Sequence, residues 1–241
     1  TYGIRNEDRT QTFNLSWNAF LPDVIKGGNP ITRGVFNGWQ VSGISTMASG
    51  IPIWLGFSGP AGSAGIAQAY YGTPDVVVLS GPGQQGTGLT PVYTCDPRTG
   101  NTSHGEKLLD VNCIGFPALG EIGQVIPPFD MRTPTRINHD ITFFKNFPMG
   151  GDQKLQFRVG IFNLFNNAFA NTSIGGDIDL TLDTVCNAFV DGVPNGAGSV
   201  NDHVCDPTKG FSLTQNTKSN FGKINLLRGH RTIEFAFKFY F

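Results

Sequence analysis

The sequence contains no run close to the roughly eighteen apolar residues that a membrane-spanning helix needs. Charge is also scarce, because only 15% of the 241 residues are charged and 17 basic side chains nearly balance 18 acidic ones. A helical membrane protein is therefore excluded. A nucleic-acid partner is disfavoured too, since it would require a stripe of lysine and arginine.

Cysteine and histidine are few, with four of each, which argues against a zinc centre. None of the cysteines forms a C-x-x-C pair, and His203 shares no liganding pattern with them. An even number of widely spaced cysteines in loop-like sequence instead predicts two disulfides formed in an oxidising compartment. Three connectivities are open, and we expect the local one, Cys95 with Cys113 and Cys186 with Cys205.

The motifs that could carry other chemistry are incomplete. Residues 81–86 read G-x-G-x-x-G, but the continuation TGLTPVY has none of the helical period that a dinucleotide site needs. Asp177, Asp179 and Asp183 could offer oxygen ligands to calcium, yet the remaining positions of a calcium loop are missing. No serine or cysteine lies in a G-x-S-x-G elbow. We expect no cofactor and no enzyme, and keep the three aspartates only as secondary metal candidates.

What the sequence has in excess is phenylalanine (20 residues) and glycine (32 residues). Large apolar residues alternate with polar or small ones, the period of a strand with two different faces, in five segments: 12–21, 39–57, 139–147, 154–165 and 232–241. Lys145 and Asn163 break the pattern. Both lie near strand ends, where a lysine can reach the polar boundary and a bulge can shift the register.

The connections between these segments alternate in length. They are short at 22–38, very long at 58–138, short at 148–154 and very long at 166–231. Outer-membrane barrels sort their loops in this way, with tight periplasmic turns at one end and extended loops at the other. The long connections hold all the cysteines and are rich in Gly, Pro, Asn and Ser, so we expect irregular surface structure without helices.

Alternation alone also fits a soluble β-sandwich, but other features favour lipid contact. The last strand has about the nine to eleven residues that cross a bilayer, and its apolar face is bulky throughout. Aromatic residues gather at the short-turn ends of the strands, as in an interfacial girdle: Phe20, Trp39, Phe147, Tyr240 and Phe241. The sequence thus predicts an all-β transmembrane antiparallel barrel segment of about five strands with two long loops.

Four stretches resemble the carboxy-terminal part of TonB-dependent outer-membrane receptors, in the Oar-like branch that carries a carboxypeptidase-regulatory-like domain. They are FNLSWNAFLP, NGWQVSGISTMASGIPI, LQFRVGIFNLFNNAF and GHRTIEFAFKFYF. The resemblance implies that the barrel-assembly machinery reads the final alternating row: Ile233, Phe235, Phe237, Phe239 and Phe241.

The resemblance also implies a role that five strands cannot fill alone, because such receptors close about twenty-two strands around a plug. Residues 1–241 would then be the carboxy-terminal part of the barrel, a fragment without a plug domain. A TonB complex, acting through the missing amino-terminal part, would drive substrate uptake with the proton-motive force. The long loops would lie outside the cell and the carboxy terminus in the periplasm.

Loop aromatics are the candidate contacts for a small-molecule, peptide or glycan substrate: Trp54, Tyr70, Tyr71 and Tyr93. The same residues could instead pack the loops against each other. Two other functions stay open, an outer-membrane porin or adhesin-like barrel and a secreted β-sandwich lectin.

Overall fold

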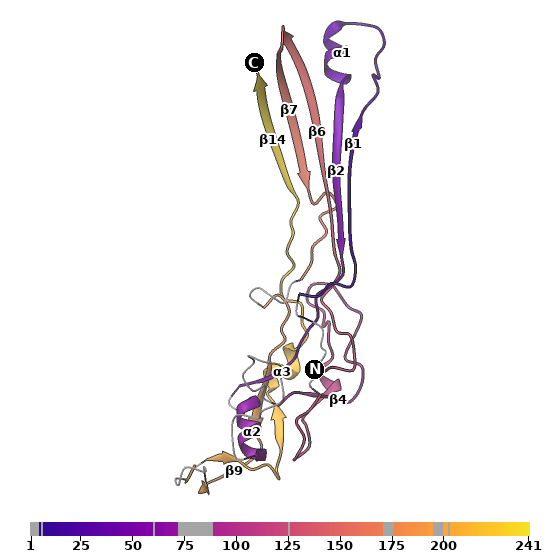
Figure 1. Cartoon of the computed structure of the whole chain (residues 1–241). Coiled ribbons are helices and arrows are strands. Elements are labelled where there is room, and N and C mark those ends of the chain that lie inside the picture. Colours follow the sequence, from indigo (N-terminus) through magenta and orange to yellow (C-terminus); the bar gives the residue numbers. More distant parts are fainter. Residues whose placement is uncertain are drawn as a thin grey trace. The chain divides into compact units, whose positions relative to one another are not determined.

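The computed structural model describes residues 5, 7–59, 61–71, 89–124, 126–170, 176–194, 200–201 and 203–241. The chain forms two compact units, which Figure 1 follows in sequence order. We call residues 9–50, 134–169 and 228–241 the sheet unit, and residues 1–8, 51–133 and 170–227 the loop unit.

The sheet unit is a five-stranded antiparallel sheet in the order β1-β2-β6-β7-β14. Its strands correspond to the five segments predicted from the sequence: β1 (Thr12–Phe20), β2 (Trp39–Ala48), β6 (Arg136–Gly150), β7 (Gln153–Phe162) and β14 (Thr232–Tyr240). Each strand pairs with the next one of this sheet along the chain, and the sheet does not close on itself, so β1 and β14 form its edges. The predicted class, an antiparallel β-barrel segment, is confirmed.

All four strand pairings join odd-numbered residues to odd-numbered residues, except at the β6–β7 turn, where a register shift puts Gly150 opposite Gln153. Trp17 lies opposite Gly43, Phe143 opposite Val159, and Phe157 opposite Phe237. Because successive side chains of a strand point to opposite faces, the odd residues of all five strands share one face. We call it the apolar face, and the even-numbered face the polar face.

Two short connections lie at the same end of the sheet. The β6–β7 turn contains Gly150 and Gly151, whose φ angles of 108° and 58° are the left-handed values that glycine adopts without strain. The β1–β2 connection contains helix α1 (Pro30–Phe36), whose first turn is capped by the Asn29 side chain accepting from the Ile31 amide. Both long insertions therefore leave and re-enter the sheet at its other end.

The two residues that break the alternation, Lys145 and Asn163, are each accommodated by their local surroundings. Lys145 is 3% exposed, lies against the Phe147 ring, and donates from Nζ to the backbone carbonyl of Asn37 in the β1–β2 connection. A backbone carbonyl of the neighbouring connection therefore accepts from the buried ammonium, and its reach to the polar boundary stays a prediction. Asn163 follows the last residue of β7 and has a φ of 54°, so it turns the chain out of the sheet.

One predicted strand is shorter than its sequence pattern. Alternation runs from residue 39 to 57, but β2 ends at Ala48. Beyond it, Pro52 forms an isolated bridge with Arg132, and Ile53, Leu55 and Phe57 are buried in the core of the loop unit. Alternation with a period of two therefore occurs both in strand β2 of the sheet and in a segment that packs into the core of the loop unit. The spacing of apolar residues alone does not distinguish these two environments.

The loop unit has its own hydrophobic core, so the expectation of irregular surface structure without helices was wrong. Its helical elements are α2 (Ser63–Tyr71), the 3-10 turn η1 (Val111–Cys113) and α3 (Gln215–Asn220). Its short strands are β3 (Phe57–Ser58), β4 (Val92–Tyr93), β5 (Ile114–Gly115), β8 (Leu182–Cys186), β9 (Phe189–Val190), β10 (Val193–Pro194), β11 (Val200–Asn201), β12 (Val204–Cys205) and β13 (Phe211–Leu213).

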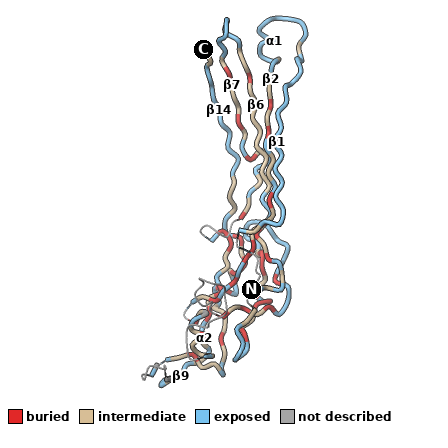
Figure 2. The backbone as a smooth tube through the Cα atoms, in the orientation of Figure 1, coloured by how far each residue is buried: buried red, intermediate tan, exposed pale blue. Residues whose placement is uncertain are grey.

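Both insertions contribute to this core. The largest fully buried apolar side chains are Ile66, Leu89 and Leu109 from the first insertion and Leu182, Phe221 and Ile224 from the second. Figure 2 shows buried segments in this unit, in contrast to the exposed traces of β1 and β14. Backbone pairing joins the insertions as well, because β3 is parallel to β8 and the Leu108 amide donates to the Gly222 carbonyl at 2.8 Å.

Gly43 on β2 gives a direct test of the sheet. A Cβ added to Gly43 would lie 2.5 Å from the Trp17 ring, which covers this position on the apolar face. We expect Gly43→Ala to displace the indole and destabilise the protein by about 1–3 kcal/mol, measured by denaturant unfolding in detergent.

The matched control is Gly34→Ala in α1, where an added Cβ meets nothing within 4 Å. In a Trp17→Ala background, Gly43→Ala should cost little, because the obstructing ring is gone. An undiminished cost in that background would contradict the packing explanation.

Candidate functional site

The apolar face is a candidate interaction surface of the sheet unit. Its β14 residues are exposed, with Phe237 at 70%, and the Phe157 and Phe237 ring centroids lie 4.9 Å apart. The odd-numbered apolar residues of β7, and of β6 up to Phe147, are half-buried, and exposed apolar side chains of this face lie on β1, β2 and β14: Phe13, Leu15, Trp17, Met47, Ile233, Phe235, Phe237 and Phe239. A contiguous apolar surface of this kind marks a partner or a membrane. It is not the core of a sandwich.

The predicted aromatic girdle needs a correction. Trp39 and Phe147 belong to the apolar face, but Phe20 pairs with Gln40 and Tyr240 with Lys154, which puts both on the polar face. The register decides this, because it fixes which side chains of a strand share a face. Proximity to a strand end was not enough to assign a face.

The polar face carries a hydrogen-bonded basic cluster near the short-turn end. Arg158 donates from Nε to Oε1 of Gln156 at 2.6 Å and from Nη2 to the Tyr240 hydroxyl at 3.3 Å. The Nζ atoms of Lys154 and Lys238 lie 4.7 and 4.8 Å from the centroid of the Tyr240 ring. Charged groups on one face and phenylalanines on the other are typical of strands between water and lipid.

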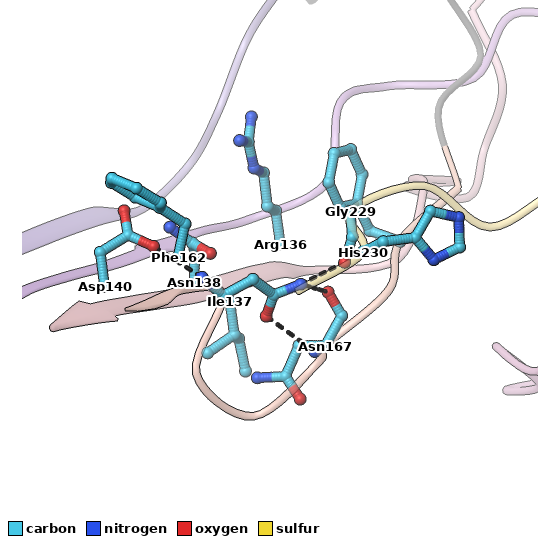
Figure 3. A pocket seen from close by; sticks show the side chains of 10 residues that line it. Arg136, Ile137, Asn138, Asp140, Phe162, Asn167, Gly229 and His230 are labelled. Atoms are coloured by element: carbon cyan, nitrogen blue, oxygen red, sulfur yellow. Dashed lines mark hydrogen bonds between the residues drawn. The ribbon is translucent and has the colours of Figure 1, made fainter. Parts of the chain in front are cut away.

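A pocket of about 200 Å³ lies at the other end of the sheet unit, where β6 begins and β7 ends (Figure 3). It is lined by Arg136, Ile137, Asn138, Asp140, Phe162, Asn163, Asn167, Phe169, Gly229 and His230. The β6 residues Arg136, Asn138 and Asp140 are consecutive even-numbered positions and so share the polar face. The pocket is therefore polar on its β6 side.

Asn163 holds the pocket together. Its amide accepts from the Asn167 backbone N–H at 2.8 Å and donates to the carbonyls of Asn167 and Gly229. The Asn163 backbone N–H donates to Asp140 Oδ1 at 2.8 Å. These bonds, drawn in Figure 3, join β6, the end of β7 and the segment leading to β14.

The predicted substrate aromatics do not form one site. Trp54 and Tyr71 are exposed, whereas Tyr70 is half-buried with its hydroxyl donating to the Pro117 carbonyl at 3.0 Å. Tyr93 is only 8% exposed, and burial raises the pKa of its phenol to about 12. Tyr70 and Tyr93 thus pack inside the loop unit, in agreement with the alternative hypothesis that these aromatics pack the loops. Trp54 and Tyr71 remain accessible to solvent.

The candidate metal ligands are also dispersed. Asp177 is fully buried, Asp179 accepts from the Thr181 amide, and Asp183 accepts from the Ser58 hydroxyl at 2.8 Å. Within the described ranges, no group of three or more His, Cys, Asp or Glu side chains is placed to hold a metal ion. The G-x-G-x-x-G segment, 81–86, lies outside the described residues.

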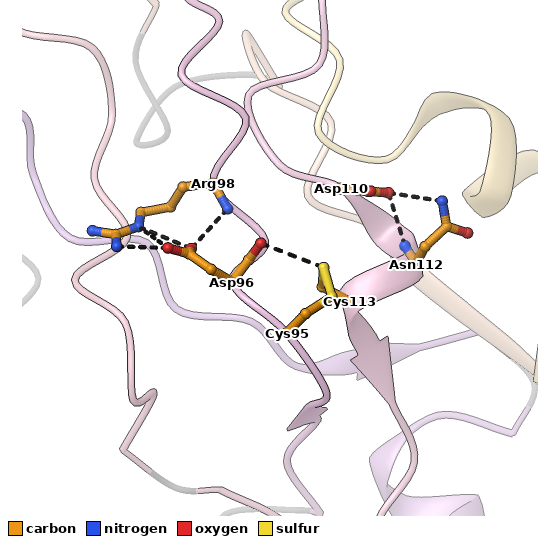
Figure 4. The surroundings of a disulfide bond; sticks show 6 residues. All are labelled: Cys95, Asp96, Arg98, Asp110, Asn112 and Cys113. Carbon is orange, nitrogen blue, oxygen red and sulfur yellow. Dashed lines mark hydrogen bonds and ion pairs between the residues drawn. A yellow bond between two sulfur atoms is a disulfide. The ribbon is translucent and has the colours of Figure 1, made fainter.

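The disulfides have the expected local pairing, and both lie in the loop unit. Cys95 is bonded to Cys113, with Cα atoms 4.8 Å apart, and Cys186 to Cys205, with Cα atoms 5.4 Å apart. Beside the first bond, shown in Figure 4, Arg98 makes an ion pair with Asp96 at 2.7 Å. The hydrogen bond from this guanidinium holds the pKa of the Asp96 carboxyl below its usual value.

Comparison with known proteins agrees with this geometry. The family model described as an outer membrane beta barrel domain matches residues 1–233, and the chain belongs to that family. It is therefore a protein of the outer membrane. Searches of curated proteins and of solved structures gave no match. Within the part of the chain that the structure describes, no helix is both long and apolar enough to span a membrane.

Sequence reasoning missed the pocket. Only Asn163 was singled out, for breaking the alternation, and that irregularity was the one available signal. Arg136 and Asn138 precede the predicted start of their strand at residue 139, and His230 lies inside the predicted long connection 166–231. Nothing in their spacing predicts that they meet, because the register of β6 and the turn at Asn163 bring them together.

Adjacent residues of β6 test which face meets lipid. We expect Phe143→Lys to cost about 2–4 kcal/mol, the penalty for a charge on the lipid side near the bilayer centre. Thr142→Lys, one residue earlier on the polar face, should have little effect. The measurement is the amount of heat-modifiable barrel in outer membranes, and equal losses for the two variants would contradict the facial assignment.

Proposed function

We propose that the chain is the carboxy-terminal barrel segment of a TonB-dependent transporter that takes up a substrate with the proton-motive force. The observation that carries this proposal is the folded loop unit between strands of a lipid-facing sheet. Its core of buried residues and two disulfides hold both long insertions in a defined shape. A preorganised surface of this kind suits selective capture of a substrate better than passive flow.

The same observation favours a second candidate, an adhesin-like or porin-like barrel. A stable loop unit with exposed aromatics, such as Trp54 and Tyr71, could attach to a surface without moving a solute. The two candidates differ in energy coupling and in whether the lumen is permanently open. Neither requires an enzymatic activity.

In the proposed arrangement the loop unit lies outside the cell and the short turns face the periplasm. Outer-membrane barrels place their long loops outside, and disulfides persist in that compartment. TonB would act through an amino-terminal part of the receptor, and the barrel-assembly machinery would read the aromatic row of β14 and Phe241.

Energy coupling can be measured without knowing the substrate. We expect the complete receptor, purified in detergent, to retain TonB from envelope extracts and to leave proteoliposomes impermeable to small sugars in swelling assays. A passive porin would make the vesicles swell, and an adhesin-like barrel would retain no TonB. Either result would contradict the proposal that the chain belongs to a TonB-dependent transporter.

The proposed assembly signal has its own test. We expect Phe241→Ser to lower the amount of heat-modifiable protein in the outer membrane several-fold while synthesis stays unchanged. Phe20→Ser is the matched control, because Phe20 is also a highly exposed aromatic at the short-turn end. Normal membrane insertion of the Phe241 variant would count against the signal.

A further inference from the structure

The pocket between β6, the end of β7 and residues 229–230 is large enough for one residue of a peptide or one ring of an oligosaccharide. Its volume of about 200 Å³ is below the roughly 300–1,000 Å³ of pockets for drug-sized ligands. A single amino-acid residue or a single sugar ring is the fragment that fits such a space. The rest of a longer ligand would lie outside the pocket.

The polar lining divides into engaged and available groups. Asn163 uses its amide oxygen and nitrogen within the protein, and Asp140 Oδ1 accepts from the Asn163 backbone. Among the described residues, by contrast, no side-chain hydrogen bond or ion pair involves Arg136, Asn138 or His230. Figure 3 labels these three residues among those that line the pocket and draws no hydrogen bond to their side chains.

Arg136 is the strongest of the available groups. Its guanidinium carbon lies 4.7 Å from the centroid of the Phe169 ring, which restrains the side chain while leaving its N–H edges free. No acidic side chain of the described chain lies within ion-pair distance of it. An exposed guanidinium that stacks on a ring, with no acidic partner among the described residues, matches a carboxylate, which accepts two parallel N–H bonds.

The remaining lining sets the other requirements on the ligand. Asp140 lies on the same face, four residues along β6, and can accept a hydrogen bond from a peptide N–H or a hydroxyl. The Phe162 ring is 40% exposed and offers an apolar surface to an aliphatic group or the flat side of a sugar.

We propose that this pocket binds the carboxylate-bearing end of a peptide or acidic oligosaccharide, with Arg136 pairing with the carboxylate. Asn138 and His230 hydrogen-bond the groups next to it. The substrate class rests on the proposed uptake function, because the pocket would then select what enters the barrel. The carboxylate chemistry is shared by both sources, and binding measurements separate them.

The test is calorimetric titration of the detergent-purified full protein with two matched pairs of probes. One pair is the tripeptide Ala-Ala-Phe and its carboxy-terminal amide, and the other is trigalacturonate and its methyl ester. We expect one acid to bind at least about tenfold more tightly than its neutral partner, because the charge-assisted bidentate pair is lost in the neutral form. The preferred pair identifies the source.

Arg136→Gln should remove the preference for the acid and leave the neutral probe unaffected, and Arg136→Lys should keep only part of it, since lysine lacks the planar fork. Arg33→Gln on exposed α1 is the control that leaves binding unchanged. Heat-modifiability verifies that each variant is folded.

The proposal fails if neither acid binds, if acids and neutral probes bind equally, or if Arg136→Gln retains the preference. Loss of TonB retention with carboxylate binding intact would instead remove only the transport proposal.

Discussion

The sheet depends on one constraint, that up to the β6–β7 turn all strand pairings join residues of the same parity. With that register, Phe143, Phe157 and Phe237 lie on one face and Arg158, Glu234 and Lys238 on the other. A slip of one residue between β7 and β14 would turn Glu234 and Lys238 towards lipid, at a cost of several kcal/mol. The alternation of apolar and polar residues thus gives the sheet its two different faces, and it is also typical of the outer membrane barrel family to which the chain belongs.

The loop unit is stabilised against a different cost, the conformational entropy lost when long connections are ordered. Long connections rich in glycine and asparagine cost conformational entropy when they are ordered, and this chain offsets the cost by burying apolar residues from both insertions together. Gly222 shows how close the packing is, because its φ of 78° and its position against the Leu109 backbone leave no room for a side chain. The insertions therefore act as one folded body.

A feature could be predicted from the sequence when it depends on residues that are close together in the chain. Alternation is a local property, so the five strands and their apolar face could be predicted, and the local cysteine pairing agreed with the structure. The core around Leu109 and Phe221 could not, because residues distant in sequence form it and their spacing has no period. The Arg136 pocket depends on strand register and on the turn at Asn163, neither of which composition specifies.

The sharing of one core by two insertions has a consequence for folding order. Pairing β2 with β6, and β7 with β14, closes the long segments 49–135 and 163–231. Loop-closure entropy and high contact order make such pairings slow when the intervening chain is unstructured. A loop unit that condenses early would shorten the effective distance for both closures at once, so it would serve as a template for the sheet.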